Sequence, residues 1–223
     1  MKKICLLSTV AVAAVASASA ALAANVVVDG DFNNTNAAFQ TIFSGSTFNA
    51  WTVTNGSIDL IGGYWQSPSG ANAATGGTNG SVDLDGDNPG GISQLIGGLT
   101  SGNTYTLTFA LSGNPDGGPS TKSVDVSIGS VANDNFTYTT TSNTHTNMQY
   151  IIESVSFTAN ASNTLSFVSQ DASSSPYGPV VGDVSIVAGS SIPEASTWAM
   201  MFAGFAALGF LGLRGRRAAA FPD

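Results

Sequence analysis

The chain has 223 residues with 6 basic and 14 acidic side chains, so its formal charge at neutral pH is −8. Between residues 25 and 190 twelve acids stand against a single base, Lys122, which leaves −11. Such a charge repels nucleic acid and anionic lipid surfaces, so both are poor candidate partners of this part of the chain. The only cysteine is Cys5, so disulfides, thiol nucleophiles and cysteine metal ligands are excluded after it.

The N-terminus has the pattern of a cleaved signal peptide. A basic start, Met1-Lys2-Lys3, is followed by an apolar run from Ile4 to Val15, and Ala21-Leu22-Ala23 forms an A-x-A cleavage site. We expect signal peptidase to remove residues 1–23, so that the mature chain begins at Ala24 or Asn25. An uncleaved membrane anchor is the alternative.

Residues 25–188 predict one all-β domain. Apolar and polar side chains alternate strictly over Thr104–Leu111 and Lys122–Ile128. Further short strands are predicted at Val26–Asp29, Trp51–Thr54, Ser57–Ile61, Ser81–Asp85, Ile92–Ile96, Asn135–Thr139, Tyr150–Thr158, Thr164–Ser169 and Val184–Val187. Gly-, Pro- and Asn-rich turn clusters separate them. About eleven short strands without helical periodicity favour a two-sheet β-sandwich, a jelly roll.

Large aromatic residues outside the alternating strands are candidates for glycan binding. Trp51 follows an alternating pattern with Val53, which places it in the core. Tyr64 and Trp65 lie beside a Gly-Gly pair and are followed by Gln66, so they could form a stacking platform with a hydrogen-bonding neighbour. Packing of Trp65 against a sheet is the competing interpretation.

Three alternating carboxylates form the one metal candidate. On an extended strand Asp83, Asp85 and Asp87 project from the same face, and they repel unless a hard cation such as Ca²⁺ lies among them. A solvated acidic turn is the preferred alternative. No other cofactor is predicted.

Catalysis finds little support in the sequence. His145 is the only histidine, it lies in a polar stretch without a nucleophile motif, and we expect it to be solvated. No pair of carboxylates stands out as the acid and base of a glycoside hydrolase. The chain is therefore predicted not to be an enzyme.

The C-terminus carries an apolar run after a short linker at residues 189–191. Trp198–Leu213 is 16 uncharged residues, roughly 24 Å as a helix and a little short of the ~30 Å hydrocarbon core. Arg214, Arg216 and Arg217 follow, which the positive-inside rule places in the cytoplasm. We therefore predict one transmembrane helix over 198–213.

Residues 192–217 of this tail combine Pro193-Glu194, Trp198, Gly204-Phe205 and the arginine cluster. In this combination the tail resembles the PEP-CTERM sorting signal of exopolysaccharide-producing Gram-negative bacteria, with Ala195 where the family has its second proline. The resemblance implies recognition by an exosortase, a membrane-embedded cysteine peptidase, and passage from the inner membrane to the cell surface or extracellular matrix.

A second resemblance rests on four segments of the β domain, at residues 50–65, 81–86, 90–94 and 112–118. On these segments the domain resembles the choice-of-anchor C family of bacterial surface proteins. That family is related to the plant cell-wall domain of unknown function 642, whose fold is similar to galactose-binding-like sandwiches. In related carbohydrate-binding sandwiches, acids at the two ends of the domain help to hold a structural calcium. Here those ends read Asp29-Gly-Asp-Phe-Asn33 and Gly182-Asp183-Val184, which depart from the family pattern.

These observations predict an exported, exosortase-sorted surface or matrix protein that is non-catalytic and binds extracellular polysaccharide. Two alternatives stay open at this point. One is a purely structural matrix protein, and the other is a glycan-active hydrolase.

Overall fold

The computed structural model describes residues 24–33, 39–69, 79–172, 175–189, 201–202 and 204–205. Within these ranges it has twelve β-strands. They are β1 Phe39–Phe43, β2 Thr47–Phe48, β3 Trp51–Asn55, β4 Ser57–Ile61, β5 Ser81–Asp83, β6 Gly91–Ile96, β7 Thr104–Gly113, β8 Thr121–Ile128, β9 Val131–Thr139, β10 Ile151–Thr158, β11 Asn163–Ser169 and β12 Pro179–Ala188.

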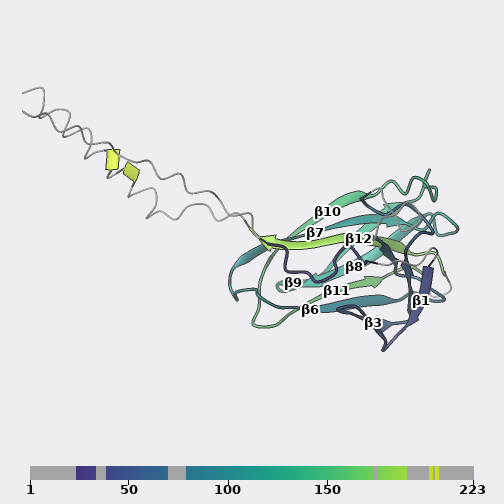
Figure 1. Ribbon diagram of the computed structural model, residues 1–223, viewed down its shortest axis with the longest axis horizontal. Coiled ribbons are helices and arrows are strands. Elements are labelled where there is room, and N and C mark those ends of the chain that lie inside the picture. The colour runs from purple at the N-terminus through teal and green to yellow at the C-terminus, as the bar shows by residue number, and fades with distance from the viewer. Residues whose placement is uncertain are drawn as a thin grey trace, which may run out of the picture.

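The strands form two six-stranded sheets, in the orders β1-β4-β5-β12-β7-β10 and β2-β3-β6-β11-β8-β9. Every pairing between named strands is antiparallel. In Figure 1 β7, β10 and β12 lie above β3, β6 and β11, as two layers. Counted from β5 as the first strand, the last eight strands run 1-8-3-6 in one sheet and 2-7-4-5 in the other, which is jelly-roll topology. The all-β jelly-roll prediction is confirmed.

The alternation read from the sequence determines which side chains fill the space between the sheets. Leu107, Phe109 and Leu111 of β7 are fully buried, as are Val124 and Val126 of β8. Burying each such side chain stabilises the fold by about 1.5–3 kcal/mol.

Aromatic rings join the two sheets. Phe109 from the first sheet packs edge-on against Phe167 of the second, with 5.2 Å between ring centroids. Trp51 is fully buried, as predicted. Its indole N–H donates to the Asp29 carbonyl at 3.1 Å, so its polar atom is also satisfied.

The structure corrects the predicted strands in the N-terminal part of the domain and at β9. Val26–Asp29 is not a strand, and it is tied to β12 by the Val26 N–H bond to the Ile186 carbonyl at 3.1 Å. The edge strands β1 and β2 were not predicted from the sequence. Strand β9 begins four residues before its predicted start, because a mostly exposed edge strand needs no apolar alternation.

A second, smaller apolar cluster lies on the outer face of the first sheet. It consists of Ile61, Trp65, Met148 and Val180, with Tyr150 packed against it. The loops that follow β4 and precede β10 cover this part of the sheet. They are fastened to each other because the Gln66 N–H donates to the His145 carbonyl at 2.8 Å. The rest of this outer face is open and carries the candidate site.

Several predictions concern segments beyond the described residues. The signal peptide 1–23 lies there, and so do the sorting-motif residues Pro193, Glu194, Trp198, Arg214, Arg216 and Arg217. Within the described part of the chain, no helix has the length and apolar character needed to cross a membrane.

Candidate functional site

A polar row crosses the outer face of the first sheet. Thr41 of β1 lies opposite Asp59 of β4, and Asp59 lies opposite Asp83 of β5. Their chain neighbours Ile58 and Val82 belong to the main core. Because successive side chains on a strand point to opposite faces, the row of polar side chains points outward.

A cleft of about 250 Å³ opens over this row. The aromatic residues that line it are Phe39, Tyr64, Trp65 and Tyr177, and the acidic ones are Asp59, Asp87 and Asp116. They come from β1, β4, the loop after β4, the turn before β6, the segment after β7 and the segment before β12. Residues far apart in the sequence therefore meet at one place on the sheet.

Exposed aromatic side chains form one wall of the cleft. Phe39 is 45% exposed and packs edge-on against Tyr64, which is 37% exposed, with 5.2 Å between ring centroids. Tyr64 also packs against the ring of His145, with 4.5 Å between the two ring centroids. Tyr177 lines the cleft from the segment before β12 and packs closely against Gly117, where a Cβ atom would lie 2.2 Å from its ring. These contacts hold the rings in place while leaving aromatic surface accessible.

Two carboxylates of the cleft lie near each other without a base between them. The Thr41 hydroxyl donates to Asp59 Oδ1 at 2.6 Å. Burial raises the pKa of Asp59, the Thr41 bond lowers it, and the negative charge of Asp87 raises it. Asp87 is exposed, and its N–H donates to the Ser57 hydroxyl at 2.8 Å. Both carboxylates are therefore positioned to accept hydrogen bonds from a ligand.

The third carboxylate, Asp116, belongs to a hydrogen-bonded group at the rim. Its Oδ2 accepts from the Tyr64 hydroxyl at 3.1 Å, and its Oδ1 lies 2.7 Å from His145 Nε2. The prediction that His145 is merely solvated is wrong, because its ring is bonded to Asp116 and packed on Tyr64. No sequence pattern joins these residues, because Asp116 lies 29 positions from His145 and 52 positions from Tyr64.

The amide of Asn114 is oriented from below the cleft. Its Nδ2 donates to Asp83 Oδ2 at 2.6 Å, and its Oδ1 accepts from the Asp116 N–H at 2.9 Å. Asp83 is fully buried, and its other oxygen accepts from the N–H groups of Asp85 and Gly178, both at 3.0 Å. Burial raises the pKa of Asp83 well above its ordinary value. Asp83 is therefore a support for Asn114 and not a ligand-binding group itself.

Lys122 holds together the two segments behind Asn114 and Tyr177. It is fully buried, and its Nζ donates to the carbonyls of Gly117, at 2.9 Å, and Tyr177. Burial lowers the pKa of Lys122, whereas the nearby carboxylates of Asp171, Asp83 and Asp85 raise it. Removing this ammonium would leave both carbonyls and the acids around it without their cation.

Asp85 lies in the same buried region. It is fully buried, and neither carboxylate oxygen has a hydrogen-bond partner of acceptable geometry, although the Ser169 hydroxyl is near enough to lower its pKa. The pKa of Asp85 is raised to about 7, because burial, the largest effect, and the charge of Asp171 raise it more than the Ser169 hydroxyl and Lys122 lower it.

The structure separates the three predicted glycan-binding residues. Tyr64 lines the cleft with an exposed ring, as a binding residue should. Trp65 also borders the cleft, but it is only 2% exposed and its indole N–H donates to the Ser81 hydroxyl at 3.0 Å, so it offers little surface for stacking. Gln66 is half-buried, and its Oε1 accepts from the Met148 N–H at 3.2 Å. The competing interpretation, sheet packing, describes Trp65.

The predicted cluster of Asp83, Asp85 and Asp87 does not form. The strand ends at Asp83, so the three carboxylates do not share a face, and Asp87 lies in the cleft while the other two are buried. Among the described residues no group of three or more His, Cys, Asp or Glu side chains is arranged to hold a metal ion. The residues predicted to bind Ca²⁺ therefore do not fit a cation together.

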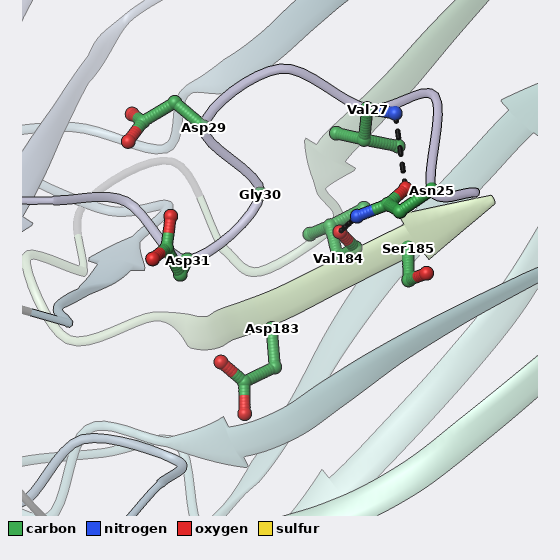
Figure 2. A pocket seen from close by; sticks show the side chains of 8 residues that line it. All are labelled: Asn25, Val27, Asp29, Gly30, Asp31, Asp183, Val184 and Ser185. Atoms are coloured by element: carbon green, nitrogen blue, oxygen red, sulfur yellow. Dashed lines mark hydrogen bonds between the residues drawn. The ribbon is translucent and has the colours of Figure 1, made fainter.

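The acids at the two ends of the domain do come close in space. Asp29, Asp31 and Asp183 line one open cavity of about 410 Å³, and Figure 2 shows the first two on the N-terminal loop and the third on β12. Both oxygens of Asp29 already accept hydrogen bonds, from the Asn33 N–H at 2.9 Å and the Asn49 amide at 2.5 Å. Their carboxylates do not converge on one point in Figure 2, so this group does not fit a cation either.

With the fold and the cleft described, the comparison with known families becomes informative. The family described as "Protein of unknown function (DUF642)" matches residues 25–187, which is most of the chain and the whole β-sandwich. The chain belongs to the DUF642 family. The resemblance of the β domain to domain of unknown function 642 is thereby confirmed at the level of that family.

Similarities of this DUF642 chain to individual proteins are weaker. It is 34% identical over 97 residues to halomucin of Haloquadratum walsbyi, a match that covers 40% of this chain and 1% of halomucin. The chain thus spans about 1% of the length of that relative.

Three solved structures are similar to this chain over part of its length. One, described as "CBM4 structure and function", has a TM-score of 0.42 and 14% identity, covering 73% of this chain and 99% of the other. A family 35 carbohydrate-binding module from Paenibacillus barcinonensis has a TM-score of 0.39 and 15% identity, covering 67% and 99%. A family GH115 4-O-methyl-alpha-glucuronidase has a TM-score of 0.44 and 11% identity, covering 79% of this chain and 19% of that enzyme. At these scores the cleft of the DUF642 chain has to be interpreted from its own residues.

Proposed function

We propose that this chain is an exported protein of the cell surface or extracellular matrix, and that its β-sandwich binds polysaccharide in the cleft without cleaving it. The observation that carries the binding proposal is the composition of the cleft. Accessible rings of Phe39, Tyr64 and Tyr177 stand beside the oriented amide of Asn114 and the carboxylate of Asp87. Aromatic faces contact the C–H surface of sugar rings, while amide and carboxylate groups bond to their hydroxyls.

The size of the cleft also suits a sugar. At about 250 Å³ it is smaller than the roughly 300–1,000 Å³ pockets that enclose drug-sized ligands. A site of this volume accommodates a small unit such as one sugar residue. Since the cleft is open at the surface, the rest of a polymer could continue outside it.

Replacing Tyr64 tests this proposal. Tyr64→Ala removes a ring that contributes mainly to the surface, so we expect binding to a panel of soluble polysaccharides on an array to fall at least tenfold. The melting temperature should change by less than about 2 °C, because an exposed ring contributes little to folding. Phe43→Ala is the matched control, since Phe43 is 56% exposed on the same sheet and lies outside this cleft. Failure of the correctly folded wild-type chain to bind any glycan would leave a purely structural matrix protein as the better proposal.

The non-catalytic part of the proposal has a separate test. Asp59 and Asp87 are the best candidates in the cleft for the general acid and general base of a hydrolase, because the charge of Asp87 raises the pKa of Asp59. We expect no release of reducing ends from any polysaccharide that binds. Release that disappears in Asp59→Asn would make the cleft a hydrolase site instead.

Export and sorting are proposed from the sequence of the two ends. We propose that signal peptidase removes residues 1–23, and that the C-terminal segment 192–217 holds the chain in the inner membrane until an exosortase processes it. Mass spectrometry of the chain expressed in its own cells should find an N-terminus at Ala24 or Asn25. Arg214, Arg216 and Arg217 changed together to Gln should alter how the chain distributes between the membrane fraction and the medium. An unprocessed N-terminus would contradict export by this route.

A further inference from the structure

The charges of the cleft bear on which sugar it takes. Asp59, Asp87 and Asp116 all line it, and no Lys or Arg among the described residues does. Lys122 is the sole base between residues 25 and 190 of the sequence. Its ammonium is buried and already bonded to the carbonyls of Gly117 and Tyr177, so it is not available to a ligand.

The three acids differ in which groups of the protein already bond to their carboxylates. Asp116 accepts from the Tyr64 hydroxyl and lies 2.7 Å from His145 Nε2, so both of its oxygens have partners. Asp59 has the Thr41 hydroxyl on Oδ1, and its neighbour in the cleft is another carboxylate, Asp87. The pair Asp59 and Asp87 is therefore the part of the cleft where negative charge is not balanced by a cation.

This charge selects among the classes of sugar. A uronic acid or a sulfated sugar would bring further negative charge toward Asp59 and Asp87 and find no base to bind it. A neutral sugar would displace water from both carboxylates and supply hydroxyl groups only, which compensates charged groups poorly. An ammonium group would donate charge-assisted hydrogen bonds, which are about twice as strong as those between neutral groups.

The aromatic wall favours the same group. Tyr64 and Phe39 present partly exposed rings beside the two carboxylates, and Tyr177 lines the cleft with them. The faces of such rings attract cations, so a positively charged amine is favoured by the rings as well as by the acids. The sugar ring that carries the amine can at the same time lie against Tyr64.

The geometry points to a hexosamine with a free, protonated amino group as the unit that this cleft binds, with the amine between Asp59 and Asp87 and the sugar ring against Tyr64. This inference rests on the proposed polysaccharide-binding function and narrows it to polymers that contain de-N-acetylated hexosamine. The protein itself already stabilises a buried ammonium in a related way, since Lys122 donates to two carbonyls and lies near carboxylates.

Titration calorimetry with two matched probes tests the inference. The full chain, purified in a mild detergent because of its apolar C-terminal run, is titrated at about pH 6 with a glucosamine hexamer and with the N-acetylglucosamine hexamer. An amine of this kind is protonated there, since α-amino groups have pKa values of about 7.7–8.0. We expect the glucosamine hexamer to bind at least tenfold more tightly. Raising NaCl from about 50 to 500 mM should weaken it about three- to tenfold, because the interaction is between charges that salt screens.

Charge-neutralising variants locate the amine. Asp87→Asn should weaken binding of the glucosamine hexamer roughly ten- to hundredfold, as expected for the loss of one charge-assisted hydrogen bond, and change binding of the acetylated hexamer less than twofold. Asp59→Asn should act in the same direction. The matched control is Asp134→Asn, because Asp134 is an exposed acid on β9 of the other sheet, and it should leave both affinities within twofold.

Each outcome distinguishes this inference from the proposed function. Equal affinity for the two hexamers, or binding of a neutral or acidic polysaccharide in preference to both, overturns the amino-sugar inference and keeps glycan binding. Tight amine binding that survives both Asp59→Asn and Asp87→Asn overturns the assignment of the amine to this pair. Absence of binding to every glycan by a chain with a normal melting transition overturns both proposals.

Discussion

The outer face of the first sheet has a covered part and an open part, and the two treat the same kinds of residue differently. In the covered part Trp65 is buried, and Asp83 and Asp85 lie near the ammonium of Lys122. In the open part Tyr64 is exposed, and Asp59 lies beside Asp87 without a cation. The sequence neighbours Tyr64 and Trp65 both border the cleft, but only Tyr64 has an exposed ring.

The comparison shows that exposure decides the role of each residue more than its type does. A buried carboxylate such as Asp83, whose oxygens already accept hydrogen bonds within the protein, supports the fold. A carboxylate at the surface without one can accept groups from a ligand. We therefore expect substitutions in the covered part to change stability, and substitutions in the open part to change binding.

The largest effect should come from Lys122. Lys122→Met keeps much of the side-chain volume but removes the ammonium from the carbonyls of Gly117 and Tyr177 and from the acids around it. Removing one partner from a group of buried charges costs about 3–5 kcal/mol. We expect urea denaturation to show that the free energy of unfolding falls by an amount near the upper end of this range. Asp134→Asn, an exposed change of one charge, is the control and should stay within about 0.5 kcal/mol. A loss below about 1 kcal/mol for Lys122→Met would mean that the ammonium does not organise these segments.

The second-largest loss of stability should come from replacing Trp65. Trp65→Ala empties a site packed against Ile61, Met148 and Val180 and leaves the Ser81 hydroxyl without its donor. Substitutions of this kind cost about 3–5 kcal/mol, and we expect a value near the lower end because the site is close to the surface loops. Tyr64→Ala, one residue earlier, should cost less than about 1 kcal/mol. Similar losses for the two variants would remove the distinction between the covered and the open part.

A pH effect of intermediate size should arise at Asp85. Its pKa rises from 3.8 to about 7 on folding, so the folded protein retains a proton that the unfolded chain releases between these pH values. Stability contributed by this group is therefore present at low pH and lost as the pH rises toward and through about 7. Asp85→Asn cannot ionise, and we expect it to be more stable than the wild type by roughly 2 kcal/mol at pH 8 and about equal to it at pH 4. Denaturation curves at the two pH values measure this difference, and a constant difference between the proteins would contradict it.

The smallest effect on stability should come from Asp116. The Asp116 and His145 side chains are about one third exposed, and an exposed ion pair contributes at most about 0.2–1 kcal/mol. Asp116→Asn should therefore change the free energy of unfolding by less than about 0.5 kcal/mol. Because it removes the acceptor that holds the Tyr64 hydroxyl, it should weaken glycan binding about two- to fivefold in the calorimetric titration. Unchanged binding would show that the rim does not orient Tyr64.

The prediction from sequence succeeded where local pattern controls structure. Alternation over Thr104–Leu111 identified the core face of β7, and the pattern around Trp51 identified a buried indole. It failed where a side chain is placed by loops from elsewhere. Trp65 is covered by the segment around Met148, and no pattern near residue 65 indicates that cover.

The alternating carboxylates show the same limit. Asp83, Asp85 and Asp87 would share a face only if the strand continued, but β5 ends at Asp83 and a turn carries Asp87 away. The run of the chain after Asp83 depends on contacts with Ser57 and Gly178, which are distant in the sequence. Spacing alone could not reveal this.

The sequence by itself determined the all-β class and the faces of the long strands, since the alternation of side chains between the two faces of a strand depends only on neighbouring residues. It also determined the strong excess of acids over the single base Lys122. Only the tertiary structure decided which acids meet in a cleft and which meet the ammonium, because Asp59, Asp87 and Asp116 come from three separate segments that the sheet brings together. The difference is physical: alternation depends on neighbours along the chain, whereas a binding site depends on the distances between segments after folding.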